Sequence, residues 1–534
     1  MRGLLACLLL LPVATKSAQP VEHVIPTRKL AYLDMRFRQL MLDQYVIDRH
    51  SGVTKIFPQA KLDPKPLLEC TFPNEMEAMA LNMPSTIWDA KAGKHRMWYY
   101  NIWRLPVDQG YLFGALGYAE SRDGLAWTKP ILEQQDYKGN GKANNVIGGL
   151  GLSQWVTSVT LGHDNQIRCY LTPHENTAIL TNGIHAGPRK RFSFNPITNL
   201  QQGRAEVGPL VNDLIHVMYD PVLKRYLATV RTWAPLSGSK EQSKWRRAVA
   251  IYTSEDGVKW HNTKYLLQTD LAFDHYVENL PHRERHDLPA WSEFHDLPVQ
   301  RYERLIIGLN GILFFYDEDI AKQREIAGTE TAYFLGWSRD GYNWSRTFER
   351  QPLIDMPKGT EEWGRHTIGS PFMVVHEKEI RLYHDVGRGH SNRTYKTPKP
   401  KQIRLSRLRR DGFAGWQSGP AGGWVQTAPF EASGQLRINA DAKAGAIHVE
   451  ALEVIEERQH TGPRRWKPIS GFQKADSKAL SGDCYNAPTE WKSAQWEDLH
   501  GKLIALRFHL TNATLYSFWT RKNSGSDLVV NLFE

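Results

Sequence analysis

The chain has 534 residues, of which 41% are hydrophobic and 23% are charged, and its formal net charge is +10. A chain of this length can bury a large core or form two domains. It has no lysine-rich run and no basic groove interleaved with aromatic residues, so we expect no nucleic-acid partner. The positive excess is either solvated surface or a face that attracts an anionic substrate, such as a sulfated or carboxylated glycan.

Residues 1–18 have the layout of a secretory signal peptide. Arg2 precedes an apolar run from Leu4 to Val13, and small residues follow between positions 14 and 18. The run is too short to span a bilayer comfortably, and no later stretch contains eighteen apolar residues in succession. We therefore expect a secreted or periplasmic protein without a membrane span.

Three cysteines follow this leader, at Cys70, Cys169 and Cys484. They are widely spaced, odd in number and without a Cys-x-x-Cys pair. This pattern allows one disulfide but predicts neither a metal–cysteine site nor a disulfide scaffold. The histidine and aspartate groups also lack a fixed ligand spacing, so we expect no metal and no cofactor.

Five segments along the chain have the pattern of a strand, a turn and a returning strand. Each ends in aromatic or branched residues, which favour strands. In chain order they are "STIWDAKAGKHRMWYY" (85–100), "VTSVTLGHDNQIRCYL" (156–171), "IHVMYDPVLKRYLATV" (215–230), "LPVQRYERLIIGLNGILFF" (297–315) and "PFMVVHEKEIRLYHDV" (371–386).

A second repeated feature follows each of these segments. An alternating apolar run leads into an Asp-Gly or Asn-Gly turn, and in most copies a tryptophan follows, as in "YAESRDGLAW" (118–127). The five turns fall at positions 123, 182, 256, 340 and 411. Asp-Gly favours a tight turn because glycine adopts positive φ and the aspartate side chain bonds the nearby backbone. We therefore interpret these aspartates as structural turn residues, not catalytic groups.

Each unit contains four predicted antiparallel strands, and five units predict a five-bladed β-propeller over residues 30–420. A large multi-sheet sandwich is the alternative fold. Residues 425–534 alternate apolar and polar residues without further Asp-Gly-Trp copies. We expect an accessory β-sandwich there, and hence an all-β protein.

The blade signatures resemble those of exported bacterial proteins similar to the glycoside hydrolase family 32 and family 43 propellers. The stretches "RMWYYNIW", "LGYAESRDGLAWTKP" and "LRINADAKAGAIHVE" carry the resemblance. It implies an active site in the central funnel, where carboxylates from inner strands cleave glycosidic bonds. The chain departs from the family 32 pattern because it has no Asn-Asp-Pro motif. Its nearest text, "LNMPST", keeps Asn82 and Pro84 around Met83.

Glycoside hydrolysis requires one protonated carboxyl for the leaving oxygen and a second carboxylate that attacks or activates water. Asp213, at the start of the third inner strand, is our first candidate, with a strand-entry cap as the alternative. Glu293 and Asp296 lie in the reactive cluster "PHRERHDLPAWSEFHDLP" (281–298), where a histidine could orient one of them. A polar surface loop is the alternative for this cluster.

Further polar residues near the strand ends are candidates for contact with sugar hydroxyls. They are Asn82, His216, Arg231, His295, His366, Asp385 and His390. Arg231 could also pair with a funnel carboxylate or an anionic substituent, and a structural salt bridge is its alternative role.

The leading hypothesis is an exported glycoside hydrolase with a carboxylate pair in the funnel and a carbohydrate substrate, which includes anionic polysaccharides and oligosaccharides. A non-catalytic carbohydrate-binding propeller is the second hypothesis, and the missing Asn-Asp-Pro motif supports it. A sialidase-like enzyme is the third, suggested by the Asp-Gly turns. That hypothesis requires six blades and an arginine cluster for the substrate carboxylate.

Overall fold

The computed structural model describes residues 22–24, 32–75, 79–104, 112–136, 141–151, 155–172, 176–194, 214–235, 245–269, 274, 290–316, 329–347, 352–355, 367–387, 401–456 and 465–520. Its regular structure is almost entirely β, and the two short helices assigned within these ranges are single 3₁₀ turns, η1 (Pro73–Glu75) and η5 (Trp496–Leu499). The predicted leader, residues 1–18, lies outside the described residues. The chain divides into two compact units, one centred on Phe57–Gly415 and one built from Leu40–Ile56 with residues 416–520.

Five sheets of four or five strands follow one another in the first unit, so the predicted five-bladed propeller is confirmed. The first blade consists of β6 (Met79–Asp89), β7 (Lys94–Arg104), β8 (Leu112–Ser121) and β9 (Trp127–Thr128). The second blade consists of β10 (Trp155–Leu161), β11 (Ile167–Thr172), β12 (Asn176–Thr181), β13 (His185–Ala186) and β14 (Lys190–Arg191). The third is β15 (Ser193–Phe194), β16 (Ile215–Asp220), β17 (Arg225–Pro235), β18 (Trp245–Ser254) and β19 (Lys259–Leu267).

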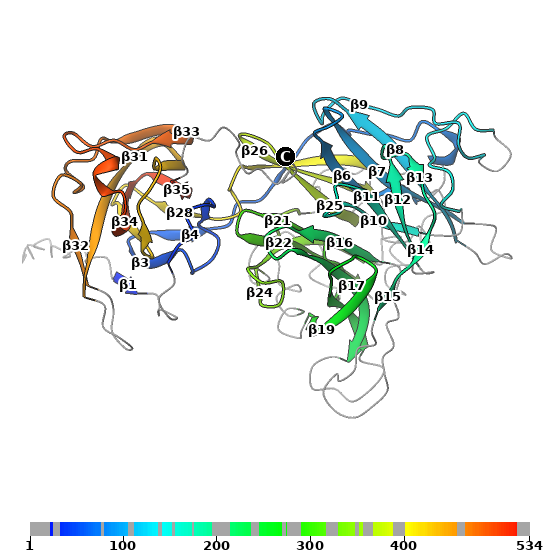
Figure 1. The fold of residues 1–534 in the computed structure, drawn as a ribbon, viewed down its shortest axis with the longest axis horizontal. Helices are drawn as coiled ribbons and strands as arrows, with labels where there is room; N and C mark the ends of the chain where they lie inside the picture. The colour runs from blue at the N-terminus through cyan, green and yellow to red at the C-terminus, as the bar shows by residue number, and fades with distance from the viewer. Residues whose placement is uncertain are drawn as a thin grey trace, which may run out of the picture. The chain divides into compact units, whose positions relative to one another are not determined.

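The fourth blade is β20 (Ala290–Asp296), β21 (Val299–Tyr302), β22 (Leu305–Tyr316), β23 (Thr329–Ser338) and β24 (Trp344–Arg346). The fifth is β25 (Thr367–Val375), β26 (Glu379–Gly387), β27 (Gln402–Arg409) and β5 (Lys61–Leu62). The strands β6, β10, β16, β21 and β25 surround one centre (Figure 1), and residues of all five line a common axial space.

The inner strands are joined to one another by side chains. The inner strand of each blade pairs with only one neighbouring strand, and its other edge exposes backbone groups that need partners. At four of the five blade junctions a side chain of one blade accepts a backbone N–H of the next blade. The pairs are Ser85 with Val159, Thr157 with Ile215, Ser158 with Val217, Gln300 with Met373, and Asp385 with Met83.

The junction of the third and fourth blades uses charge instead. Asp220, at the end of β16, and Arg301, in β21, form a buried bidentate ion pair. Asp220 also accepts the backbone N–H groups of Val222 and Leu223, which form the following turn. Asp220 therefore stabilises the turn after β16 and also holds two blades together.

The Asp-Gly turns lie between the third strand and the outermost strand of the first, third and fourth blades. In each, the aspartate Oδ1 accepts two backbone N–H groups at 2.8 Å, as Asp123 does from Leu125 and Ala126. These backbone hydrogen bonds lower the pKa of Asp123 to about 2. The following glycine has positive φ, 70° at Gly124. The turn interpretation is therefore confirmed for Asp123, Asp256 and Asp340.

The fifth Asp-Gly turn differs from the sequence-based prediction. Asp411 is buried, has a φ of 61°, and accepts hydrogen bonds from Tyr302 and Arg38. The strand after it, β28 (Gly415–Ser418), pairs with a strand of the second unit and adds nothing to the fifth blade. The outermost strand of that blade is β5, which precedes the first blade in sequence and pairs with β27.

The strands of the second unit form one twelve-stranded sheet. The expected C-terminal sandwich is therefore not confirmed. Besides β28, its strands are β1 (Glu22–Val24), β2 (Gln39–Leu40), β3 (Ile47–Ser51), β4 (Thr54–Ile56), β29 (Gly423–Thr427), β30 (Phe430–Glu431), β31 (Arg437–Glu456), β32 (Arg465–Pro468), β33 (Leu480–Pro488), β34 (Leu503–Thr511) and β35 (Ala513–Trp519). The long strand β31 pairs with β35 in its first part and with β34 in its second, and its register shifts between Ala442 and Ile447.

A buried histidine and a partly buried one face each other at the junction of the fifth and first blades. The ring centroids of His95, on β7, and His376, after β25, are 5.5 Å apart. Burial, followed by the positive charge of Arg381, lowers the pKa of His376 to about 4. Burial, then His376 and Arg381, lowers the pKa of His95 to about 4 as well. The nearby carboxylates Asp123 and Glu379 oppose these shifts only in part.

We expect Asp220→Asn to lower the free energy of unfolding by about 3–5 kcal/mol, because it leaves the buried guanidinium of Arg301 without its counter-charge. Asp256→Asn, which changes an exposed turn and keeps an acceptor oxygen, should cost about 1 kcal/mol or less. Urea unfolding of both variants measures the difference. Equal losses would show that the Asp220–Arg301 pair does not secure the junction.

We also expect the unfolding free energy to fall as pH is lowered from about 6.5 to about 4, because the unfolded histidines bind protons there and the folded ones do not. The double variant His95→Gln/His376→Gln should show a shallower fall over this window than the unaltered protein. His185→Gln, at an exposed position of the same unit, is the control and should not change the slope. An unchanged slope in the double variant would contradict the assignment.

Candidate functional site

The candidate site lies where the five inner strands begin. A pocket there is lined by residues of every blade, and four of them also line a larger pocket farther along the axis. Among the described residues that line the pocket at the strand starts, His216 is the one titratable side chain. The lining residues are Met83, Pro84, Ser85, Thr157, Ser158, His216, Val217, Pro298, Val299, Gln300, Pro371 and Phe372.

The imidazole of His216 contacts the buried carboxylate of Asp296. Its Nε2 lies 3.1 Å from Asp296 Oδ2, and the other carboxylate oxygen accepts a hydrogen bond of 2.8 Å from the Tyr333 hydroxyl. His295 Nδ1 lies 3.1 Å from the same oxygen. Burial alone would raise the pKa of Asp296, but His295 and His216 lower it well below its usual range. Asp296 is therefore an ionised group that positions His216.

A second buried cluster joins the first and fifth blades. Lys401 Nζ lies 2.6 Å from Asp385 Oδ2 and 2.9 Å from Asn82 Oδ1. Asp385 is completely buried, so its carboxylate is occupied by Lys401 and by the backbone N–H of Met83. The structure thus brings the predicted residues Asn82 and Asp385 together, through a lysine that the sequence did not indicate.

The backbone on both sides of Asn82 is strained. Leu81 has a φ of 56° and Met83 a φ of 49°, in the left-handed region that non-glycine residues rarely adopt. Two buried side chains hold these residues in place: Asn101 accepts the N–H of Leu81, and Asp385 accepts that of Met83. Such strain is of the order of ~1–3 kcal/mol per residue and gathers at functional sites. The constrained backbone on both sides fixes the direction of the Asn82 side chain.

Glu293 lies on β20 in a different environment from Asp296. Its side chain is 8% exposed, and Arg247 Nη1 donates to it at 3.0 Å. Burial raises the pKa of Glu293, and the opposing effects of Arg247 and of the Trp291 indole do not cancel the rise. Of the two candidate acids on β20, Glu293 is therefore protonated more easily than Asp296.

Aromatic rings surround this carboxyl. Trp291 is 37% exposed and stacks on Phe315, with ring centroids 5.4 Å apart and an angle of 10° between the planes. The Arg247 guanidinium lies 5.1 Å from the ring of Trp233 and 5.3 Å from that of Phe315. A half-exposed indole beside a protonatable carboxyl could stack on a sugar ring while the carboxyl reaches its oxygen.

The remaining predicted site residues fall into two groups. Arg231 is buried in β17, and its backbone N–H donates to Leu214, so it anchors the start of the third inner strand. Asp213, His366 and His390 lie outside the described residues, and their roles stay predictions.

Lys401, Arg247 and Tyr333 were missed by the sequence analysis. Lys401 is separated from Asn82 by 319 positions and from Asp385 by 16. Arg247, on β18, and Tyr333, on β23, lie on the third strands of their blades, away from the starts of the inner strands. The two adjacent arginines in "KWRRAV", at the start of a strand, are the sequence signal for Arg247.

Within the described residues, no three His, Cys, Asp or Glu side chains are grouped closely enough to hold a metal ion. The part of the chain that the structure describes also has no helix with the length and apolar character that a membrane crossing requires.

No protein-family model and no curated protein matches this sequence. Solved structures do match. An N-acetylgalactosamine deacetylase from F. plautii, in complex with blood group B trisaccharide, is 11% identical with a TM-score of 0.39, and the match covers 68% of this chain and 97% of that one. A thermostable family-43 glycoside hydrolase is 10% identical with a TM-score of 0.35, covering 61% and 88%. The catalytic domain of an α-L-arabinofuranosidase from Coprinopsis cinerea is 8% identical with a TM-score of 0.39, covering 66% and 96%.

The matched structures include glycoside hydrolases. The five-bladed fold itself follows from the sheet topology of this chain.

We expect Lys401→Met to lower the unfolding free energy by about 3–5 kcal/mol, because it leaves the Asp385 carboxylate buried without a cation. The double variant Lys401→Met/Asp385→Asn should recover part of this loss. Lys478→Met is the control, since it breaks an ion pair whose side chains are 59% and 58% exposed, and should cost less than about 1 kcal/mol. A loss at Lys401 no larger than that of the control would refute the buried-pair interpretation.

Proposed function

We propose that this protein is a glycoside hydrolase that cleaves its substrate where the inner strands begin. The observation that carries the proposal is Glu293, a buried carboxyl with a raised pKa beside the exposed ring of Trp291. A carboxyl of this kind is protonated more readily than an exposed one and can give its proton to the leaving oxygen of a glycosidic bond.

The proposal assigns different roles to the three predicted acids. Glu293 is the proton donor, and Asp213, two positions before the first residue of the strand that carries His216, is the second carboxylate. Asp296 is a positioning residue, because it is enclosed by His216, His295 and Tyr333. Glu293 and Asp296 are three residues apart on β20, a span of ~10 Å in an extended strand. Trp291 and the His216 pocket can therefore hold neighbouring parts of one saccharide.

In the proposed reaction, Glu293 protonates the glycosidic oxygen as the bond to the anomeric carbon breaks. Asp213 either bonds to that carbon or takes a proton from the water that attacks it. His216 lies in the pocket wall, and its Nε2 is directed to Asp296. This contact fixes the orientation of the imidazole ring, which can then contact a sugar hydroxyl.

A non-catalytic carbohydrate-binding propeller is the second candidate. Two observations favour it: Asn82 and Met83 stand where the resembled family has an Asn-Asp pair, and no carboxylate lines either axial pocket among the described residues. The sialidase-like alternative required six blades, whereas the ring has five.

Export and an anionic substrate are further parts of the proposal. The leader-like residues 1–18 support secretion or delivery to the periplasm. The net charge of +10 supports attraction of a sulfated or carboxylated glycan.

The test is a screen of neutral and anionic oligosaccharides and polysaccharides for released sugar. We expect Glu293→Gln to lower kcat by about 10²–10⁴-fold with little change in KM, because the glutamine cannot donate a proton. Trp291→Ala should mainly raise KM. Glu255→Gln, the same substitution at an exposed position of the propeller, is the matched control.

Binding without any product in the unaltered protein would favour the non-catalytic propeller. Full activity of folded Glu293→Gln would eliminate Glu293 as the proton donor.

A further inference from the structure

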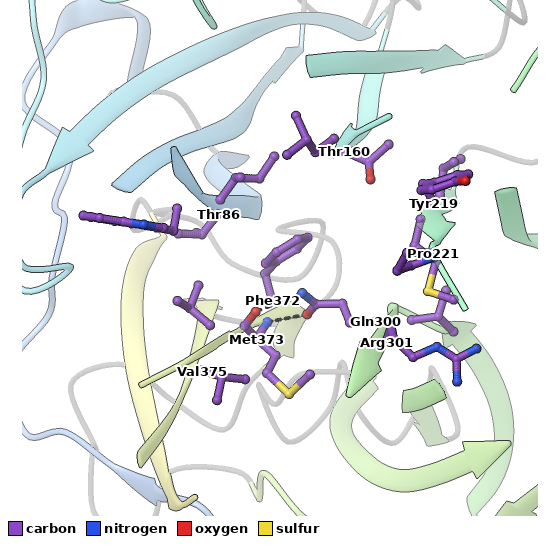
Figure 2. Close-up of a pocket in the computed structure, with 16 residues that line it drawn as sticks. Thr86, Thr160, Tyr219, Pro221, Gln300, Arg301, Phe372, Met373 and Val375 are labelled. Carbon is purple, nitrogen blue, oxygen red and sulfur yellow. Dashed lines mark hydrogen bonds between the residues drawn. The ribbon is translucent and has the colours of Figure 1, made fainter. Parts of the chain in front are cut away.

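Two arginine–carboxylate pairs join the third and fourth blades. One lies at the ends of the inner strands, where Arg301 belongs to the wall of the larger axial pocket (Figure 2) and is neutralised by Asp220. Their side chains are 2% and 1% exposed, and Asp220 also accepts two backbone N–H groups. Because this carboxylate is enclosed on all its hydrogen-bonding sides, the pair is structural.

The second pair, Arg247 and Glu293, is built differently. Arg247, on β18 of the third blade, donates from Nη1 to Oε2 of Glu293, on β20 of the fourth blade, at 3.0 Å. Their side chains are 19% and 8% exposed, so solvent reaches part of each. A molecule bound beside this pair can therefore reach the carboxyl, which is excluded for Asp220.

Aromatic rings of both blades hold the Arg247 guanidinium. Its central carbon lies 5.1 Å from the ring of Trp233, directly opposite on β17, and 5.3 Å from the ring of Phe315, on β22 of the fourth blade. The faces of aromatic rings attract a cation. Phe315 is also the ring on which the exposed Trp291 stacks. The guanidinium that bonds the carboxyl and the indole beside it are therefore fixed against the same phenyl ring.

Among the described residues, Arg247 is the charged group that shifts the pKa of Glu293. Burial raises this pKa, and Arg247 opposes the rise. Its neighbour Arg246 is paired with Asp274 at 2.7 Å. The other charged or titratable side chains near Glu293 on the strands packed against it, and on its own strand, are Arg231 on β17 and His295 and Asp296 on β20, while β22 places the apolar Leu313 opposite Glu293.

A proton donor becomes an anion as it gives up its proton. A guanidinium that is already fixed beside it stabilises the new charge without rearranging during the step. We propose that Arg247 is a positioning residue for Glu293: held between Trp233 and Phe315, it orients the carboxyl, stabilises the carboxylate formed on proton transfer and sets the upper pH limit of activity. This inference rests on the proposed hydrolase activity, in which the Glu293 proton passes to the glycosidic oxygen as the bond to the anomeric carbon breaks.

The first experiment measures released sugar and the pH profile of kcat/KM for Arg247→Met and Arg247→Lys. In Arg247→Met we expect kcat at the pH optimum to fall about 10–100-fold, because the carboxylate loses its fixed donor. The basic limb of the profile should move to higher pH, because Glu293 keeps its proton longer without the cation. Arg247→Lys keeps the charge but not the planar fork, so kcat should fall while the limb stays in place.

Arg225→Met is the matched control. The Arg225 guanidinium, at the start of β17, also lies over an aromatic ring of the fourth blade, 4.9 Å from that of Tyr342, and donates to the backbone oxygen of Asp340. This variant removes a ring-stacked arginine from the same junction without touching Glu293, so kcat and the basic limb should not change. Circular dichroism and melting curves establish that each variant is folded.

A second experiment follows the Glu293 carboxyl directly and needs no substrate. In protein labelled with ¹³C at the glutamate side-chain carboxyls, the Glu293 signal is identified by its loss in Glu293→Gln. This carboxyl should titrate at higher pH in Arg247→Met than in the unaltered protein, because the cation that favours the carboxylate is gone. Arg225→Met should titrate like the unaltered protein.

The outcomes separate this inference from the proposed function. If the unaltered protein releases sugar and folded Arg247→Met keeps both kcat and the basic limb, Arg247 is not a positioning residue and the hydrolase activity stands. A lower melting temperature with an unmoved limb would reduce Arg247 to a structural role. If no saccharide is cleaved, the proposed function fails, and an identical titration of Glu293 with and without Arg247 would overturn the control of this carboxyl by Arg247 as well.

Discussion

The unpaired edge of each inner strand is the constraint on which the propeller depends. A backbone N–H at the axis has no partner strand, so the neighbouring blade must supply an acceptor. Ser85, Thr157 and Gln300 do so with neutral oxygens, and Asp385 does so with a carboxylate. Because each acceptor comes from the preceding blade, four of the five blades are held in this way by the one before them. At the third junction a buried ion pair between Asp220 and Arg301 joins the two blades instead, and loss of either partner would leave a buried charge unpaired.

This constraint also decides which acids are available for chemistry. Asp385 and Asp296 are both near the axis, yet both are enclosed by donors and cations. Acids used in this way hold other groups: Asp385 the strained backbone at Met83, and Asp296 the imidazole of His216. Glu293 has a single cationic contact and a pKa that burial raises. Glu293, the proposed proton donor, and Asp296, the proposed positioning residue, therefore differ in the direction in which their surroundings shift the pKa.

The two ends of the axis offer different chemistry from the same five strands. Near the strand starts, His216 and a set of serine and threonine residues face the pocket. At the strand ends, aliphatic side chains dominate. Side chains alternate along a strand and blades twist as they leave the axis, so one ring can present a polar surface at one end and an apolar one at the other.

The sequence alone determined the repeating unit. Asp-Gly turns such as those at Asp123, Asp256 and Asp340 depend on hydrogen bonds within three residues, and a local pattern is therefore enough to predict them. It also grouped Glu293, His295 and Asp296 in one short cluster, which the structure shows to be part of the strand β20. Tertiary structure alone decided the rest: that β5 completes the fifth blade, that Asp411 is buried, and that Lys401 reaches Asn82 across 319 positions. Those pairings depend on ring closure, which brings together residues whose separation in the chain leaves no local signal.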